Sequence, residues 1–327
     1  MTIPSSLFYN EYHGHKVEHL SVLHRELRDN RAPTTVVWTA GDSSLDNKHW
    51  FHDTVDAPPG YDRILAPPRS RPDVTYWMNH LLASVDHTVA INTAVEATTL
   101  NERTIRLRPQ DIFLRDHLQP QDILVVSIGG NDVALMPCPC TIASMLCLLR
   151  CVPASCTANG CTCGTVPLDD CCCGCGPSLA SCLCAYPPCL GYLRHLFGTR
   201  VERYIQALTS KTKPSKILVC MIYYPSEQPS RGWAGPALAS LGYDSQPSRL
   251  QSAIRKIFQE ATSRIRIQGS EVVPVPLYLA LDSKNDADYV ERVEPSATGG
   301  RKMAEYLINC MGDTITTPAK QRMHDRS

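Results

Sequence analysis

Five short runs of mostly apolar residues recur along the chain, and each is followed by a polar, proline- or glycine-containing segment. Runs of this length with almost continuous apolar character are typical of strands buried on both faces of a parallel sheet. We therefore predict five strands, at residues 35–40, 88–91, 123–128, 216–223 and 271–277.

Segments with apolar residues at helical spacing alternate with these runs. The first of them has Leu20, Leu23 and Leu27 between charged residues, and Pro72 lies near the start of the second, where proline suits a first helical turn. The predicted helices cover residues 8–29, 71–84, 191–208, 250–265 and 296–311. This alternation predicts an α/β fold: a three-layer α/β/α sandwich of flavodoxin-like type, with a five-stranded parallel sheet.

The chain of 327 residues is long enough for one large domain. We expect that domain at 35–312, preceded at 1–34 by a helix that packs on it and followed at 313–327 by a polar tail. A Cys-rich insertion at 136–190 interrupts the domain.

Polar segments directly follow three of the predicted strands. They are Gly41-Asp42-Ser43-Ser44, Asn92-Thr93-Ala94 and Gly129-Gly130-Asn131-Asp132. Because the carboxyl ends of parallel strands meet at one edge of the sheet, where such folds keep their chemistry, we expect these segments to form a site together.

Four segments, in this order, resemble the sequence blocks of the SGNH hydrolase superfamily, also called GDSL esterases and lipases. Gly41-Asp42-Ser43 resembles the first block and Gly129–Asp132 the third. The segment 92–99 lies where the second block is expected, and Glu291–Ser296 resembles a last block that reads Asp-x-x-His-Pro-Ser in the family. The resemblance covers roughly 35–312 without the insertion.

The resemblance implies a serine ester or acyl hydrolase that needs no cofactor. It places Ser43 as the nucleophile, with the Asn131 side chain and the backbone at Ala97 as an oxyanion hole. Position 97 usually holds Gly; Ala keeps the N–H, and a negative φ there would suit it. For Asn131 the alternative is an amide that ties two loops together.

The predicted base departs from the family, because Glu291 and Glu294 stand where it has Asp and His. An ordinary glutamate is a weaker base than histidine by roughly 2 pKa units, although burial or repulsion between the two carboxylates could raise one of them. Glu294 could instead cap the last helix. The sequence therefore also allows a catalytically inactive binding or metal-sensing module on the same scaffold.

His49 and His52 follow the predicted nucleophile and are the alternative source of an imidazole, with Asp53 to orient it. A helix that leaves the nucleophile turn would carry both side chains away from the Ser43 hydroxyl. A surface role is the competing interpretation.

All of the chain's 16 cysteines except Cys220 and Cys310 lie in the insertion. Thiolates at short spacing favour zinc or another thiophilic metal, although no pair of Cys-x2-Cys knuckles occurs. S-acylation at a membrane surface, disulfides and a redox-sensitive loop are the alternatives. The candidate structural zinc ligands are Cys138, Cys140, Cys161, Cys163, Cys171, Cys172, Cys173, Cys175, Cys182, Cys184 and Cys189. Cys220 and Cys310 are expected to be small buried apolar residues.

Charge and the first residues bear on partners and location. Lys and Arg together number 32, as do Asp and Glu, and no long basic run occurs, which argues against nucleic acid as a partner. The first residues lack the pattern of a secretory signal, so a cytoplasmic protein is expected, with membrane contact only through an acylated insertion. The expected substrate is a small-molecule or lipid ester.

Overall fold

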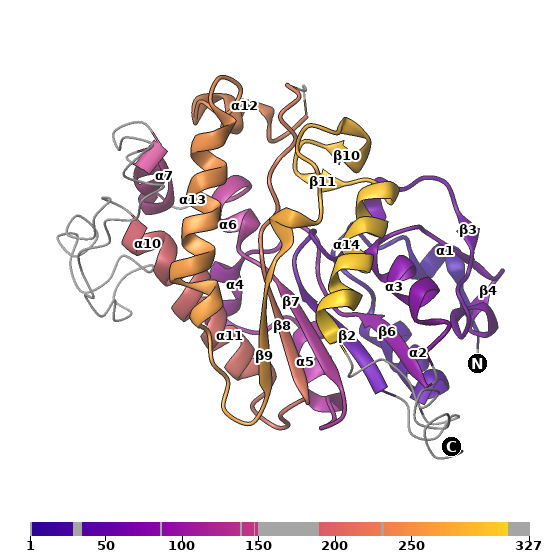
Figure 1. Cartoon of the computed structure of the whole chain (residues 1–327). Helices are drawn as coiled ribbons and strands as arrows, with labels where there is room; N and C mark the ends of the chain where they lie inside the picture. Colours follow the sequence, from indigo (N-terminus) through magenta and orange to yellow (C-terminus); the bar gives the residue numbers. More distant parts are fainter. Residues whose placement is uncertain are drawn as a thin grey trace, which may run out of the picture.

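The computed structural model describes residues 2–28, 35–85, 87–137, 139–146, 148–149, 190–229 and 232–312. Its centre is a parallel sheet of five strands in the order β6-β2-β7-β8-β9, with helices on both faces (Figure 1). The strands are β2 (Thr35–Gly41), β6 (Thr88–Asn92), β7 (Ile123–Ser127), β8 (Lys216–Met221) and β9 (Glu271–Pro276). The predicted fold class and the five strands are confirmed.

Alternate residues of the strands pack into two separate apolar cores, one on each face of the sheet. Val36 and Trp38 point into the first core, which is covered by α2 (Val17–Arg28), α4 (Leu100–Ile105), α5 (Pro109–His117), α10 (Leu190–Arg194), α11 (Val201–Leu208) and α13 (Pro247–Glu260). Val37 points into the second, covered by α3 (Val74–Leu82) and α14 (Ala297–Met311). Both faces are therefore buried, which accounts for the apolar runs.

The helix predicted at 8–29 is correct only in its second half. A short helix α1 (Ser5–Phe8) is followed by a non-helical segment up to Lys16, because Gly14 has a φ of +81°. Leu20, Leu23 and Leu27 of α2 are fully buried against the sheet. The tail at 313–327 and most of the insertion at 136–190 lie outside the described residues.

Several short elements were not predicted from the sequence, and the helix predicted at 191–208 is divided by a π-type segment at His195–Arg200. The added helices are α6 (Gly130–Ala134), α7 (Pro139–Leu146) and α12 (Gly235–Ser240), besides α4 and α5. The added strands are β1 (Ile3–Pro4), β3 (Val55–Asp56), β4 (Leu65–Ala66), β5 (Arg69–Ser70), β10 (Tyr289–Glu291) and β11 (Glu294–Pro295). None of the helices within the described ranges has the length and apolar character needed to cross a membrane.

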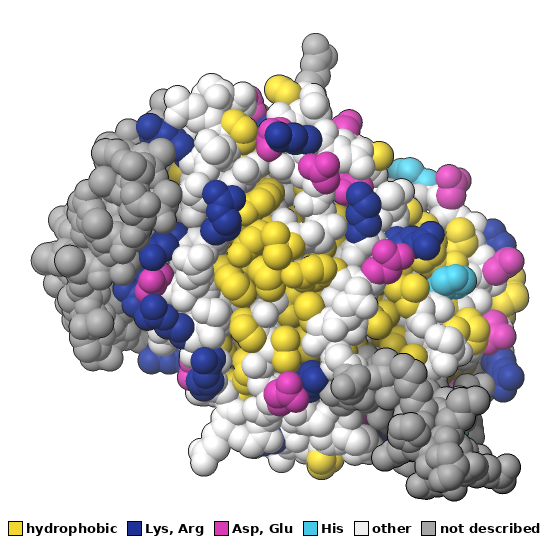
Figure 2. All heavy atoms as spheres, in the orientation of Figure 1, with side chains coloured by type: hydrophobic (Ala, Val, Ile, Leu, Met, Phe, Trp, Pro, Cys, Tyr) yellow, Lys and Arg dark blue, Asp and Glu magenta, His cyan; other side chains and the backbone are white. Residues whose placement is uncertain are grey.

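The strand β9 forms one edge of the sheet. Figure 2 shows apolar side chains gathered over its carboxyl end, between α13 and α14, and Leu279 just beyond it is exposed. Pro274 and Pro276 lie within this strand. Because proline cannot donate a ladder hydrogen bond, these residues weaken the ability of the edge to pair with another strand.

Asp122, at the start of β7, joins the N-terminal helix to the sheet. Its carboxylate accepts hydrogen bonds from the Arg28 guanidinium, from Val36 N at 3.0 Å and from Trp38 Nε1 at 2.9 Å. The Asp122 side chain is fully buried, and that of Arg28 is almost fully buried. Removing one partner from such a buried ion pair leaves a charge without compensation and lowers the free energy of unfolding.

We predict that Asp122→Ala lowers the free energy of unfolding by about 3–5 kcal/mol, because it leaves the Arg28 charge buried without its carboxylate. Urea unfolding followed by circular dichroism measures this. Asp53→Ala, at an exposed position, is the matched control and should stay within about 0.5 kcal/mol of wild type. Equal stability of the two variants would contradict the role of Asp122.

Candidate active site

The turn that carries Ser43 is set by a close approach between β2 and β7. Gly41 has a φ of +134°, and a Cβ there would come within 1.7 Å of the Ser127 carbonyl oxygen. The chain turns immediately after this contact, and Asp42 N donates to Ser127 O at 3.1 Å. Ser43 is therefore held at the carboxyl end of β2, as predicted, with its side chain mostly buried.

Asp42 organises the turn rather than activating the serine. Its carboxylate accepts from Ser44 Oγ at 2.8 Å, from Ser44 N at 3.1 Å and from Gly129 N at 3.2 Å. Ser44 Oγ also lies 2.6 Å from Ser127 Oγ. These bonds tie the first polar segment to the segment after β7.

Glu294 lies against the predicted nucleophile. The Ser43 Oγ donates a hydrogen bond to Glu294 Oε1 at 3.2 Å, and the Glu294 side chain is 3% exposed. The interpretation of Glu294 as a helix cap is wrong, because Ser296 caps α14 by accepting from Gly299 N at 3.1 Å. The carboxylate is thus directed inward to the hydroxyl.

The loop that carries Glu294 is fastened on both sides. Tyr223 Oη donates to Val293 O at 2.6 Å, and Asn47 Nδ2 donates to Pro295 O at 3.1 Å. Arg292 is buried, pairs with Asp244 at 2.7 Å and donates to the Ser226 carbonyl oxygen. These contacts fix the position of Glu294 independently of its bond to Ser43.

Glu291 does not join this arrangement. It pairs with Glu294 through the backbone of the β10–β11 hairpin, and its half-buried side chain forms no hydrogen bond or ion pair within the described part of the chain. Its negative charge contributes a small part of the repulsion that raises the pKa of Glu294. The structure therefore does not bring Glu291 into the orienting position that a second member of the pair would hold.

Glu96 is a buried carboxyl group near Glu294 that the sequence interpretation missed. Its side chain is 1% exposed, and neither carboxylate oxygen has a partner of hydrogen-bond geometry in the described residues. Burial, together with the Asp46 charge, raises the pKa of Glu96 to about 8, although Lys48 and the nearby Trp50 indole lower it in part. In the sequence, the only indication that Glu96 belongs to the site was its position between Val95 and Ala97, in the second polar segment.

The electrostatic surroundings favour the protonated form of Glu294. Burial is the main cause that raises its pKa well above the ordinary value, followed by the negative charges of Glu96 and Asp42. The hydrogen bond from Ser43 acts in the opposite direction. A glutamate in this setting is a stronger base than an ordinary one, but it is ionised only at higher pH.

Asn131 lies in the same pocket, and its amide is partly engaged. Asn131 Nδ2 donates to Thr98 O at 2.9 Å, which is the loop-tying bond that the sequence interpretation gave as the alternative. The amide has a second hydrogen, which this bond leaves available. The neighbouring Asp132 accepts from Leu100 N and Asn101 N and so holds the start of α4.

The backbone at Ala97 departs from the expectation of a negative φ. Its φ is +55°, in the left-handed region that glycine adopts without strain. The N–H groups of Ser43 and Ala97 donate to no acceptor within the described residues. Ala97 therefore has a backbone conformation suited to glycine, and its N–H is free to bind a ligand oxygen.

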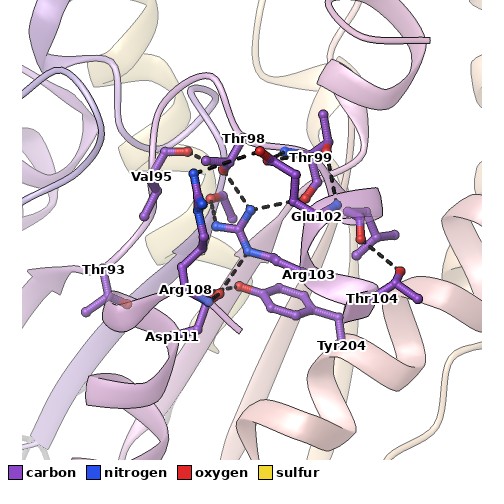
Figure 3. A network of polar contacts seen from close by, with 12 residues as sticks. Thr93, Val95, Thr98, Thr99, Glu102, Arg103, Thr104, Arg108, Asp111 and Tyr204 are labelled. Atoms are coloured by element: carbon purple, nitrogen blue, oxygen red, sulfur yellow. Dashed lines mark hydrogen bonds and ion pairs between the residues drawn. The ribbon is translucent and has the colours of Figure 1, made fainter. Parts of the chain in front are cut away.

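A buried network beneath the site supports both the nucleophile turn and the Ala97 loop (Figure 3). Arg103 donates to Gly41 O at 2.8 Å, to Thr98 Oγ1 at 2.6 Å and to Asp111 Oδ2 at 3.0 Å. Its guanidinium also lies over the Tyr204 ring, whose hydroxyl donates to Asp111. The Arg103 guanidinium thus joins the carboxyl end of β2 to the segment that follows β6.

The two histidines proposed as an alternative base lie at the surface. His49 and His52 are exposed, and His49 lies edge-on to the Tyr12 ring with centroids 4.7 Å apart. A turn and a single 3₁₀ segment (Lys48–Trp50) follow Ser43, rather than the expected helix. Within the described chain, neither imidazole bonds to Ser43.

An apolar pocket opens at the Ser43 hydroxyl. Asp42, Ser43, Asn131 and Glu294 form its polar end. The rest of the wall comes mainly from α6, α12, α13 and the segment after β8, with Val133, Ala134, Met145, Ile222, Pro225, Ala234, Ala237, Leu238, Leu241, Leu250, Ile254 and Val293. Ala97 is half-buried and does not line this pocket.

The side chains of the predicted zinc ligands lie outside the part of the chain that the structure describes. Cys138 and the candidates from Cys161 to Cys189 lie outside the described residues, as does the side chain of Cys140. No group of three or more His, Cys, Asp or Glu side chains suited to a metal ion occurs among the residues that are described. Cys220 is buried in the second core, whereas Cys310 is half-buried at its edge.

No protein-family model and no curated protein matches the sequence. Among solved structures, the chain is similar to an extracellular lipase from Streptomyces rimosus, at 14% identity and a TM-score of 0.41, covering 85% of this chain and 100% of that one. It is also similar to a lipase/acylhydrolase from Enterococcus faecalis, at 11% identity and a TM-score of 0.42, covering 84% and 94%. An acetylxylan esterase from Geobacillus stearothermophilus matches at 12% identity and a TM-score of 0.41, covering 86% and 97%. At these TM-scores the likeness carries no conclusion about activity.

We predict that Ala97→Gly raises the free energy of unfolding by about 0.5–1 kcal/mol. A left-handed alanine costs about 1–2 kcal/mol, of which the added flexibility of glycine in the unfolded chain offsets a part. Ala83→Gly is the control, because Ala83 is exposed with a φ of −58° and its replacement should lower stability. Urea unfolding of the two variants should therefore give shifts of opposite sign.

We predict that Glu96→Gln reduces the loss of thermal stability between pH 5 and pH 8. The folded state holds the Glu96 proton up to about pH 8, whereas the unfolded chain releases it near the ordinary value of 4.5. The stability contributed by this proton is therefore present below pH 4.5 and is lost as the pH rises to about 8. Glutamine does not titrate, so its Tm should fall less over this range.

The matched control for this measurement is Glu18→Gln, because Glu18 is exposed on α2. Its Tm should follow the wild-type pH dependence. If Glu96→Gln also follows the wild-type curve, the buried Glu96 carboxyl does not titrate as described.

Proposed function

We propose that this protein is a serine ester hydrolase of the SGNH type, with Ser43 as nucleophile and Glu294 as the base. The observation that carries the proposal is the hydrogen bond from Ser43 Oγ to a buried, inward-facing glutamate at 3.2 Å. A serine hydroxyl becomes a useful nucleophile when a positioned acceptor takes its proton. Glu294 is the acceptor in this position, and its raised pKa makes it a stronger base than an ordinary carboxylate.

The first half of the reaction transfers the acyl group to the enzyme. Ser43 Oγ forms a bond to the ester carbonyl carbon, and its proton moves to Glu294. The negative charge on the former carbonyl oxygen is stabilised by the Ser43 N–H and by the second amide hydrogen of Asn131, two residues that line the pocket. The Ala97 N–H, which has no acceptor within the described residues, is proposed as a third donor from outside the pocket lining. The bond to the alcohol then breaks, and Glu294 returns the proton to the leaving oxygen.

The second half repeats these steps with water. Glu294 takes a proton from a water molecule, whose oxygen bonds to the acyl carbon of the acyl-Ser43. The Ser43–acyl bond breaks, the proton passes to Ser43 Oγ, and the carboxylic acid leaves. Glu291 contributes charge and no proton transfer, because its side chain forms no hydrogen bond to Glu294 or Ser43 within the described residues.

The ionisation of Glu294 sets the pH range in which the proposed hydrolysis operates. Burial of both glutamates and the repulsion from Glu96 favour a protonated Glu294 at low and neutral pH. Lys48, which is completely buried in an ion pair with Asp46, partly offsets the repulsion that the Asp46 carboxylate exerts on Glu96. We therefore expect the proposed activity to rise with pH.

A second candidate function is an inactive module that binds a ligand in the same pocket. Two observations favour it: the raised pKa keeps Glu294 protonated over a wide range, and Asn131 already donates to Thr98 O. A protonated Glu294 accepts no proton from Ser43. Such a module would bind an ester or alcohol without turnover.

We predict that Ser43→Ala abolishes hydrolysis of p-nitrophenyl acetate and that Glu294→Gln lowers kcat by about 10²–10⁴, because an amide cannot accept the proton. Wild-type turnover should be higher at pH 9 than at pH 6. Glu291→Gln is the matched control and should retain activity within about threefold.

Labelling with a fluorophosphonate probe at pH 9 separates the two candidate functions, since only an activated serine reacts. An adduct on Ser43 that is lost in Glu294→Gln supports the hydrolase. No adduct on the wild-type protein at either pH, together with no turnover above Ser43→Ala, rules out the hydrolase and leaves the binding module.

A further inference from the structure

The pocket at Ser43 has its polar groups at one end only. Asp42, Ser43, Asn131 and Glu294 lie at the end where the ester bond would react. Away from this end the wall is mostly aliphatic, as with Ala237 and Ile254, and Tyr223 and Trp233 add two aromatic rings to it; the Tyr223 hydroxyl is already bonded to Val293 O. The wall beyond the reacting end therefore offers few hydrogen-bond partners to a polar group of a substrate.

A second apolar cavity lies next to the first. The two share five lining residues: Val133, Met145, Ile222, Leu250 and Ile254. The second is lined further by Leu148, Leu149, Leu193, Phe197, Ala253 and Ile257. We call these two adjacent apolar cavities together the channel; the first of them opens at Ser43.

The channel lies on one side of the sheet, and its lining side chains come mainly from α6, α7, α10, α12 and α13. Figure 1 shows α13 beside α7 and α10, with α12 near the upper end of α13. Leu250, Ile254 and Ile257 lie one turn apart along α13, and all three line the channel. One helix thus supplies aliphatic side chains to the walls of both cavities.

We infer that this channel binds the hydrocarbon acyl chain of the substrate, so that the ester is a neutral lipid-like ester of a medium or long acyl chain. The inference rests on the proposed function, because it assigns Ser43 as the point of attack. Each buried CH₂ group would raise binding about three- to fourfold. The acyl part is assigned to the channel because it stays attached to Ser43 until water releases it.

The same lining disfavours the other ester classes. The hydroxyls of a sugar would lose water in the channel without finding hydrogen-bond partners. An acetyl group would leave most of the channel unused. The carboxyls of Asp42, Glu96 and Glu294 near the reacting end repel an anionic ligand, which favours a neutral ester over a free fatty acid.

The first experiment compares p-nitrophenyl esters of two to ten carbons at pH 9, below their solubility limits. For wild type, kcat/KM should rise by about three- to fourfold per CH₂ over the first several carbons. Ala237→Trp places an indole in the channel and should lower the ratio of ten-carbon to two-carbon activity at least tenfold. Ala239→Trp, on an exposed face of the same helix, should leave the ratio unchanged.

The second experiment tests the channel without requiring turnover. Calorimetry with Ser43→Ala protein should detect binding of neutral 1-decanol but not of ethanol. The double variant Ser43→Ala, Ala237→Trp should lose decanol binding at least tenfold, and Ser43→Ala, Ala239→Trp should keep it.

The outcomes separate the two proposals. Decanol binding without ester turnover in wild type would overturn the proposed hydrolysis and support the channel. Absence of decanol binding, or equal binding in the Ala237→Trp and Ala239→Trp backgrounds, would overturn the channel even if short esters are hydrolysed. A wild-type preference for the two-carbon ester would also overturn it.

Discussion

The hydrogen bond between Ser43 and Glu294 lies in a buried region that also holds the carboxyl groups of Glu96 and Asp42. Burial alone raises the pKa of Glu294, and the charges of Glu96 and Asp42 raise it further. The same surroundings make Glu294 a better proton acceptor once it is ionised and make that ionisation harder. Under the proposed function, this balance sets the pH at which Glu294 can accept the Ser43 proton.

Several buried charged groups near the site have ion-pair or hydrogen-bond partners that satisfy them, unlike the two glutamates. Lys48 bonds both oxygens of Asp46, and Arg103 bonds Asp111, Gly41 O and Thr98. In contrast, Glu96 and the second oxygen of Glu294 lack hydrogen-bond partners among the described residues. Uncompensated polar atoms of this kind lower stability, so they occur mainly where function requires them. The left-handed backbone conformation of Ala97, next to Glu96, also lowers the free energy of unfolding.

The fold separates the polar and apolar parts of the site. The strand ends of β2, β6 and β7 bring the polar segments together at one edge of the sheet, and the β10–β11 hairpin adds Glu294 from the C-terminal part of the chain. The apolar wall comes instead from helices that cover the first core, above all α13. Ligand sites of this composition are common: a mostly apolar cavity with a few placed polar groups.

The strands, the parallel sheet and the convergence of the polar segments follow from the sequence, because apolar runs, their alternation with helices and the position of Gly41 are local signals. The helix boundaries near Gly14 and the short helices α4 and α5 were missed, because capping and turn geometry decide them more than periodicity does. The proximity of Glu294 to Ser43 was predicted only through a resemblance, since 251 positions separate them and no local rule brings them together.

Tertiary structure alone decided the electrostatics. Glu96 looks like an ordinary acidic residue in the sequence, and only its burial next to Asp46 raises its pKa. Whether Glu294 capped α14 or faced Ser43 was equally open, because both need only a carboxylate before a helix; the bond of Asn47 to Pro295 O and the cap by Ser296 decided it. The sequence determines which groups are present and along which strands they lie, whereas the pKa of a group depends on neighbours and water exclusion that exist only in the folded chain.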